Sequence, residues 1–245
     1  MRMKLVSVNV GLPREVIWRG INVTTGIFKQ PVEGRVSLRK LNLDGDRQAD
    51  LTVHGGKDKA VYCYPLQHYD YWKSELPGHD LLMGMFGENF TIDFRGEYIS
   101  SSEIGAGAAL PEDLIRIGDR FSVGSAEVVV TQPRLPCYKL GVKFQLDDMV
   151  KRFFVSGRTG FYLAVTREGE VGAGDEMRAI GQPRDEHSNS VTVSDITRLY
   201  IAKRYTDDDE RLVRQALGVG ALPESWKEYF RERLEKMKVQ LENYS

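Results

Sequence analysis

The 245-residue chain lacks the features that identify several large classes of protein. It has only two cysteines, Cys63 and Cys137, too few for the disulfide framework of a small secreted domain. No apolar run approaches membrane-spanning length, and the N-terminal MRMKLVSVNV is typical of a first strand rather than a signal peptide. The formal net charge of -1 gives no global field that would attract nucleic acid or anionic lipid. We therefore predict a cytoplasmic protein that binds neither a nucleic acid polymer nor a membrane.

The motifs of ordinary metal and nucleotide sites are missing too. The sequence contains four histidines and no CxxC or HExxH motif, which argues against a zinc site built from protein ligands. No segment has P-loop spacing. His68 and His79 are interpreted as surface or satisfied core groups, and His187 as a linker residue. Cys63, inside AVYCYP, is interpreted as a core strand residue.

What the sequence does contain is a long β-rich region followed by a short helical one. Hydrophobic residues make up 41% and charged residues 28%, which suits a globular protein with a large core. Up to about residue 182, short β-branched and aromatic runs end at Gly, Pro or Asp, a pattern typical of strands. FSVGSAEVVV predicts a hairpin around Gly124 and Ser125, and a second hairpin is predicted within residues 161–180. Helices are predicted near residues 65–76 and 145–157.

Beyond residue 182 the signals become helical. A polar linker, 183–190, precedes three predicted helices in 191–245, which need a shared core and so form a small three-helix module. Ser194 or Asp195 would cap the first helix, Thr206 the second, and Pro223 would open the third. The linker's polarity predicts that few contacts join this module to the domain formed by residues 1–182.

The stretch QPRLPCYKL, residues 132–140, places Cys137 where a structural cysteine is unusual. Its two prolines predict an irregular loop and not a continuing strand. Arg134 and Lys139 flank the thiol, and their positive charge favours the thiolate. A thiolate here could act as a nucleophile, a redox group or a soft metal ligand, and the local sequence leaves these alternatives open.

The segment DGDRQADLTVHGGKDKAVYCYP supplies a second group of candidate residues. Gly55 and Gly56 let the backbone approach a ligand and present amides to an anion. His54, Lys57 and Lys59 surround this turn with donors and positive charge. An ordinary turn with solvated lysines is the alternative interpretation.

Three further stretches carry weaker signals. Lys29 in TGIFKQPV, taken alone, reads as a surface lysine. In GMFGENFTI, a turn leading into a strand accounts for Glu88 and Asn89. Carboxylates close together in one loop could bind a hard cation but more often cap and solvate turns; they are Asp44, Asp46 and Asp50.

Taken in order, DLTVHGGKDKAVYCYP, GENFT, IGDRF and QPRLPCYKLG resemble the MOSC domain, named after the C-terminal part of molybdenum-cofactor sulfurases. The resemblance is closer to the hydroxylaminopurine-resistance (YiiM-type) branch, in which a three-helix module follows the MOSC core, and it covers nearly the whole chain. It implies an α+β, mainly β fold: a β-barrel-like core with peripheral helices, followed by the helical module.

The resemblance also implies a pyranopterin molybdenum cofactor with Cys137 as the protein's thiolate ligand. A dithiolene cofactor brings most of the metal's ligands itself, so one soft sulfur from the protein suffices. The cofactor's phosphate needs positive charge and backbone amides. We assign these roles to Lys29, His54, Gly55, Gly56, Lys59, Asn89 and Arg134.

Three functions follow as hypotheses. The first is a molybdenum-dependent reductase of N-hydroxylated compounds such as hydroxylaminopurine, with His54 as proton donor or orienter. Since the sequence has no flavin or iron–sulfur motif, a separate flavin or iron–sulfur reductase would supply electrons, and the helical module would either dock it or be a structural extension. The second is a carrier of the cofactor or its sulfur. The third is a metal-free thiol enzyme in which Cys137 attacks its substrate.

Overall fold

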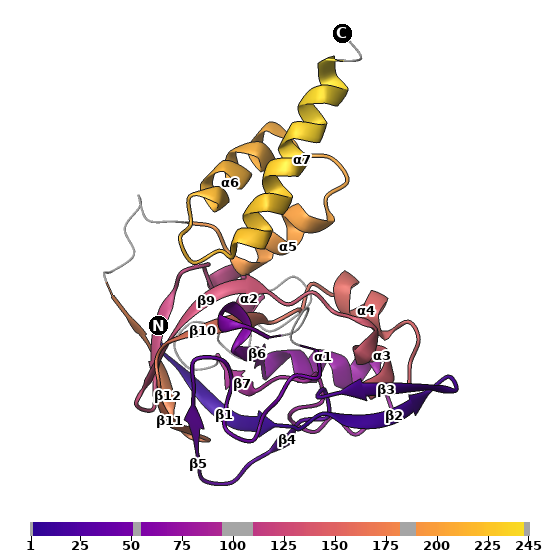
Figure 1. Ribbon diagram of the computed structural model, residues 1–245, viewed down its shortest axis with the longest axis vertical. Coiled ribbons are helices and arrows are strands. Elements are labelled where there is room, and N and C mark those ends of the chain that lie inside the picture. Colours follow the sequence, from indigo (N-terminus) through magenta and orange to yellow (C-terminus); the bar gives the residue numbers. More distant parts are fainter. Residues whose placement is uncertain (1, 51–54, 95–109, 182–189, 243–245) are drawn as a thin grey trace.

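The core of the protein is a closed β-barrel, with helices around it and a helical module on one side (Figure 1). The structure is a computed structural model that describes residues 2–50, 55–94, 110–181 and 190–242, with side chains described up to residue 236. The predicted α+β, mainly β fold class is confirmed.

The barrel consists of seven strands in the order β12-β8-β9-β10-β6-β7-β1, and pairing of β12 with β1 closes it. All pairings are antiparallel except that of β6 with β7, which is parallel. The strands are β1 (Arg2–Val10), β6 (Val61–Pro65), β7 (Phe90–Asp93), β8 (Arg120–Val123), β9 (Ala126–Pro133), β10 (Phe161–Arg167) and β12 (Glu176–Ile180).

Five short strands lie outside this closed ring. β4 (Gln30–Pro31) extends the sheet from β1, β2 (Arg14–Trp18) pairs with β3 (Ile21–Thr25), and β5 (Arg35–Leu38) pairs with β11 (Gly169–Gly172). The inner faces of the barrel strands bury β-branched and aromatic side chains, and this apolar burial is the main force that stabilises the ring.

One predicted hairpin is confirmed and the other is wrong. β8 and β9 pair through Gly124 and Ser125, and Gly124 has the positive φ of 55° that a tight turn requires. Within residues 161–180, however, β10, β11 and β12 do not pair with one another. β10 lies between β6 and β9, β11 pairs with β5, and β12 lies between β8 and β1.

A second, aromatic core lies under the helices beside the barrel. Helices α1 (Gln67–Glu75) and α4 (Met149–Val155) occur where helices were predicted, and the short α2 (Pro111–Leu114) and α3 (Tyr138–Phe144) were not predicted. Tyr64, Trp72, Phe86 and Phe153 pack ring against ring there, with Trp72 donating to the Tyr64 hydroxyl at 2.7 Å. Phe144 of α3 and Phe153 of α4 belong to this cluster, which holds the two helices against the barrel (Figure 1). Cys137 directly precedes α3.

The C-terminal module consists of α5 (Val193–Ile201), α6 (Asp207–Leu217) and α7 (Glu224–Glu242), the last preceded by Pro223 as predicted. Thr206 caps α6 as predicted, accepting from the Asp209 amide at 3.2 Å. The predicted cap of α5 is wrong by two or three positions. Thr192 is the N-cap: its hydroxyl accepts from the Asp195 amide, and the Asp195 carboxylate accepts from the Thr192 amide, each at 3.0 Å, which completes a capping box.

The expectation that few contacts join the module to the barrel is wrong. A single hydrophobic core runs from barrel residues such as Phe121 and Val130 into α5, α6 and α7. Arg116 and Thr192 form a β-bridge, and Trp226 donates to Gln132 of β9 at 2.5 Å. Short helices cannot bury their apolar faces among themselves alone, so they also use the outer surface of the barrel and α2. Of the predicted linker, residues 183–190, all but residue 190 lie outside the described residues.

Candidate functional site

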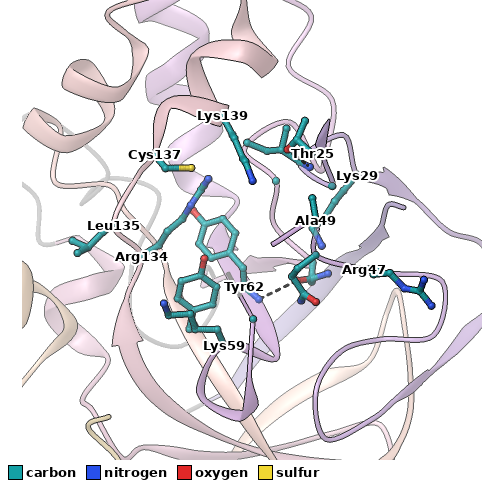
Figure 2. Close-up of a pocket in the computed structure, with 17 residues that line it drawn as sticks. Thr25, Lys29, Arg47, Ala49, Lys59, Tyr62, Arg134, Leu135, Cys137 and Lys139 are labelled. Carbon is teal, nitrogen blue, oxygen red and sulfur yellow. Dashed lines mark hydrogen bonds between the residues drawn. The ribbon is translucent and has the colours of Figure 1, made fainter. Parts of the chain in front are cut away.

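A cavity at the end of the barrel brings together most of the residues that the sequence singles out (Figure 2). Among the described residues that line it, the cations are Lys29, Arg47, Lys59, Arg134 and Lys139, and none is acidic. Cys137, Gly55 and Asn89 also line it, together with Tyr62 and Tyr162. The cavity therefore presents one thiol in a cationic, partly aromatic surrounding, which favours an anionic ligand.

Cys137 lies where the irregular segment after β9 turns into α3. It is the N-cap residue of that helix, in an extended conformation, and its carbonyl accepts from the Leu140 amide at 2.9 Å. The thiol is partly exposed and lines the cavity, with its sulfur on the same side as the Arg134 and Lys139 side chains (Figure 2). The prediction of an irregular loop holds for residues 134–137, but β9 continues through Pro133 and a helix begins at Tyr138.

Arg134 is buried and rigidly held beside this thiol. It donates to the Phe86 carbonyl at 2.6 Å, and its guanidinium lies 4.5 Å from the centroid of the Tyr62 ring. Burial alone would oppose its charge, but Tyr62, Tyr162 and Cys137 raise the pKa of Arg134, so the cation is retained. A fixed arginine with a flat, charged face is well suited to hold an oxyanion.

Glu88 is a buried carboxylate that holds the backbone segment to which Arg134 donates. It accepts hydrogen bonds from the Phe86 amide at 3.1 Å, from the Gly84 amide at 2.8 Å and from the Tyr69 hydroxyl. Burial raises the pKa of Glu88 above its ordinary value. The interpretation of GENFT as only a turn is therefore incomplete, because Glu88 fixes the carbonyl that receives Arg134.

Lys29 and Asn89 line the cavity, but their polar ends are held by Asp46. The Lys29 ammonium lies 2.5 Å from each Asp46 oxygen, and Asn89 donates to the same carboxylate at 2.9 Å. Burial lowers the pKa of Lys29, and Asp46 partly offsets that effect. The interpretation of Lys29 as a surface lysine is wrong, because its side chain is only 9% exposed. The interpretation of Asp46 as a solvated turn residue is also wrong, because its side chain is fully buried.

The HGG turn is only partly within the described residues. Gly55 and Gly56 have φ values of 115° and 84°, a region that favours glycine, and they lead into the short 3-10 helix η1 (Lys57–Lys59). Gly55 and Lys59 line the cavity, whereas Gly56 is not among the lining residues. Burial lowers the pKa of Lys59. His54, like His187, lies outside the described residues, so the structure does not test its predicted role.

Cys63 and His68 have the structural positions that the sequence predicts. Cys63 is fully buried in β6, and burial raises its pKa well above the usual range, which keeps the thiol protonated. His68 is buried in α1 with its Nε2 atom 2.8 Å from the Glu112 carboxylate. Neither residue lines the cavity that contains Cys137.

The cavity also contains residues that sequence reasoning did not select. Arg47 and Gln48 lie in the DGDRQADLTVHGG stretch, so a count of cations in that loop could have identified Arg47. Tyr62 and Tyr162 are directly opposite each other on β6 and β10, with ring centroids 5.4 Å apart. That pairing joins residues 100 positions apart, and no local pattern predicts it.

Comparisons with known proteins agree with this architecture. The MOSC domain family matches residues 50–178, and the family described as "YiiM-like, 3-alpha helix domain" matches residues 191–236. The uncharacterized protein YflK of Bacillus subtilis (strain 168) is 36% identical over 96% of each chain. Protein YiiM of Escherichia coli (strain K12) is 31% identical over 90% of this chain and 88% of its own.

Two further similarities concern structure and a longer protein. The crystal structure of YiiM from Geobacillus stearothermophilus aligns with a TM-score of 0.70 and 31% identity, covering 95% of this chain and 99% of that one. A protein named "Reductase" from Gibberella moniliformis (strain M3125 / FGSC 7600) is 29% identical over 67% of this chain but only 27% of its own length. These matches span both the barrel and the helical module, so the chain belongs to the MOSC domain family, in the YiiM-like group that carries a C-terminal three-helix domain.

Proposed function

We propose that the protein is a molybdenum-cofactor-dependent reductase of N-hydroxylated compounds, among them base analogues such as hydroxylaminopurine. The reaction converts R–NH–OH, two electrons and two protons into R–NH2 and water. The observation that carries the proposal is the single thiol of Cys137 within a cationic cavity that also has aromatic walls. Membership of the MOSC family and the name of the fungal relative support an oxidoreductase role.

The residues present fit the pyranopterin cofactor that the family implies. Among the described residues no group of three or more His, Cys, Asp or Glu side chains is arranged to hold a metal ion. One cysteine is nevertheless sufficient for a cofactor whose own dithiolene supplies the other sulfur ligands. When bound, the cofactor supplies the two-electron reduction. Cys137 would be its protein ligand.

The protein's own cations would hold the cofactor's phosphate. Arg134 is fixed and charged, and Lys59, Arg47 and Lys139 line the same cavity. Lys29 is a weaker candidate than the sequence suggests, because its ammonium already contacts Asp46. We therefore place Arg134 and Lys59 first among the phosphate-binding residues.

A proton donor is also needed, because hydroxide must leave the nitrogen as water. Tyr162 lines the cavity with a phenol that can donate a hydrogen bond to the leaving oxygen, although burial raises its pKa and makes it a weaker acid. We add Tyr162 to His54 as a candidate for this step. Electrons come from a separate flavin or iron–sulfur reductase, which an artificial donor can replace in an assay.

The test uses full-length protein purified from a host that makes the cofactor. Cys137→Ser should retain the fold but lose molybdenum and reduction of 6-hydroxylaminopurine by a reduced viologen, because an alcohol is a poor substitute for a soft thiolate. Cys63→Ser is the control: it should lose stability, since it buries a hydroxyl, but keep its metal content. Wild-type turnover in Cys137→Ser with metal bound would refute the ligand assignment. Cofactor retained without turnover in the wild-type protein would instead favour a carrier.

A metal-free thiol enzyme is the less favoured candidate. Nucleophilic cysteines are activated by an adjacent base, usually histidine. The described residues that line the cavity include no histidine or carboxylate, and His54, which the sequence offers as such a base, lies outside the described residues. The preference therefore rests on membership of the MOSC domain family. A burst of product in metal-free protein, abolished by alkylation of Cys137, would reverse this preference.

A further inference from the structure

A second cavity lies between the barrel and the helical module and adjoins the first. The two share Lys59, Leu135, Cys137 and Tyr162 in their walls. On the barrel side the second cavity is completed by Gln132, Pro133 and Pro136, and on the helical side by Tyr200, Ser225, Trp226 and Tyr229. Its volume is about 360 Å³, compared with about 100 Å³ for the first.

The helical wall of this cavity is held in place by its own hydrogen bonds. The Trp226 indole donates to the Gln132 side chain at 2.5 Å, and Gln132 in turn donates to the Asp58 carbonyl at 3.3 Å. The Tyr229 hydroxyl donates to the Tyr200 carbonyl at 3.2 Å and accepts from Arg233 at 2.7 Å. The wall is therefore formed before any ligand arrives, which reduces the entropy lost on binding.

The chemistry of the lining indicates what kind of molecule fits. Tyr200 lies 5.5 Å from Trp226 and 5.2 Å from Tyr229, measured between ring centroids, so three aromatic rings gather on one side. The barrel contributes a leucine and two prolines to the lining, and among the described lining residues Lys59 is the only cation. Such walls suit a flat, largely uncharged ring that stacks on aromatic faces.

We propose that this second cavity receives the heteroaromatic ring of the substrate and directs its N–OH group toward the shared wall at Cys137 and Tyr162. The proposal rests on the proposed reductase function and adds the place where the ring of such a substrate binds. It also gives the helical module a direct role. Tyr200, Trp226 and Tyr229 form the substrate wall, and the module is more than a structural extension of the barrel.

A variant that fills the cavity tests this without disturbing the core. Ser225 is exposed in the first turn of α7 and lines the cavity, so Ser225→Trp adds bulk where the ring would lie. Glu235→Trp places the same side chain at an exposed position of α7 that does not line the cavity. A second variant, Tyr229→Leu, removes one aromatic face, and Tyr229→Phe keeps the ring as a rescue.

Two measurements on the full-length holoprotein separate ring binding from chemistry. The first is calorimetric binding of adenine, which has the ring but no N–OH group. The second is reduction of 6-hydroxylaminopurine and of hydroxyurea, an N-hydroxylated compound without a ring. Ser225→Trp and Tyr229→Leu should weaken adenine binding and lower kcat/KM for 6-hydroxylaminopurine at least tenfold, with hydroxyurea reduction nearly unchanged. Glu235→Trp should resemble the wild-type protein. Tyr229→Phe keeps the ring but loses the hydroxyl's contacts with Tyr200 and Arg233, so it should lie between Tyr229→Leu and the wild type.

The outcomes distinguish this inference from the proposed function. The ring-binding cavity is refuted if the wild-type protein does not bind adenine. It is also refuted if Ser225→Trp and Tyr229→Leu bind adenine and reduce 6-hydroxylaminopurine like the wild type. Equal losses for both substrates would also refute it, because the effect would not depend on the ring. If adenine binds the wild type and not Ser225→Trp, but no N-hydroxylated compound is reduced, the reductase function fails while the ring-binding cavity stands.

Discussion

The buried pair of Lys29 and Asp46 allows a quantitative test of what Lys29 does. The Asp46 carboxylate is fully buried and accepts from Lys29, from Asn89 and from the Gly11 amide at 2.9 Å. Asp46→Asn keeps the shape of the side chain but leaves a buried ammonium without its counter-charge. Removing one partner of a buried pair costs about 3–5 kcal/mol, because the remaining charge is not solvated. For a chain of this length that corresponds to a fall in Tm of about 6–20 °C.

The assay is a thermal and urea unfolding series at neutral pH on Asp46→Asn, Lys29→Met and the double variant. Each single variant should lose stability on this scale, and the double variant should lose less than the sum by about 0.5–3 kcal/mol, the range for coupled neighbours. Asp148→Asn is the matched control, because Asp148 pairs with Arg152 at 2.7 Å with both side chains about half exposed. That exposed pair should be worth only about 0–1 kcal/mol.

The reasoning fails if Asp46→Asn costs no more than Asp148→Asn. It also fails if Lys29→Met keeps wild-type stability and yet loses the cofactor. In that case Lys29 would be a ligand-binding residue, as its position in the sequence suggests, and not the partner of a buried carboxylate.

Three other predictions concern two lysines, Lys59 and Lys143, whose pKa is lowered by burial. Lys59 lines both cavities, so Lys59→Glu should lower the retained pterin and molybdenum several-fold. The control Lys203→Glu, at an exposed position after α5, should not lower them. Equal pterin and molybdenum contents in the two variants would contradict the phosphate-binding role of Lys59. Because burial lowers the pKa of Lys59, its charge is lost at a lower pH than that of an ordinary lysine, so cofactor retention should fall on the alkaline side earlier in the wild type than in Lys59→Arg. Burial, with a further contribution from Arg14, lowers the pKa of Lys143 to about 8. At pH 8 the neutral fraction of the Lys143 amine is therefore on the order of a hundredfold larger than that of an ordinary lysine. Amine acylation at pH 8, read by peptide mass spectrometry, should label Lys143 ahead of Lys203, and equal rates would contradict the lowered pKa.

The parts of the fold that sequence predicts well are those decided by neighbouring residues. Gly124 and Ser125 suffice for the β8–β9 turn, and Thr206 suffices to start α6, because a tight turn and a cap depend on a few adjacent residues. The second hairpin fails for the opposite reason. The strands of residues 161–180 look like consecutive partners, but β11 pairs with β5 and β12 with β8 and β1, and closure of the barrel decides these pairings.

The same distinction holds in the candidate site. Cys137 could be selected from its own loop, because prolines and cations around a thiol are a local signal. The state of Lys29 could not, because it depends on Asp46, 17 residues further on, and on Asn89, which directly precedes β7. Tyr162 was missed because its importance arises only when β10 brings it opposite Tyr62 and beside Cys137.

Removing the helical module by truncation would not show whether it docks a reductase or stabilises the barrel. Val193, Ile196 and Leu199 of α5 are completely buried in the core that the module shares with the barrel. Tyr200, the next residue along, lines the cavity beside Cys137. Removing the module would therefore remove burial and the cavity wall together, and a loss of activity would have two causes. Ser225, at an exposed position on the cavity side of α7, can be substituted without disturbing the shared core, so Ser225→Trp can assign a function to the module.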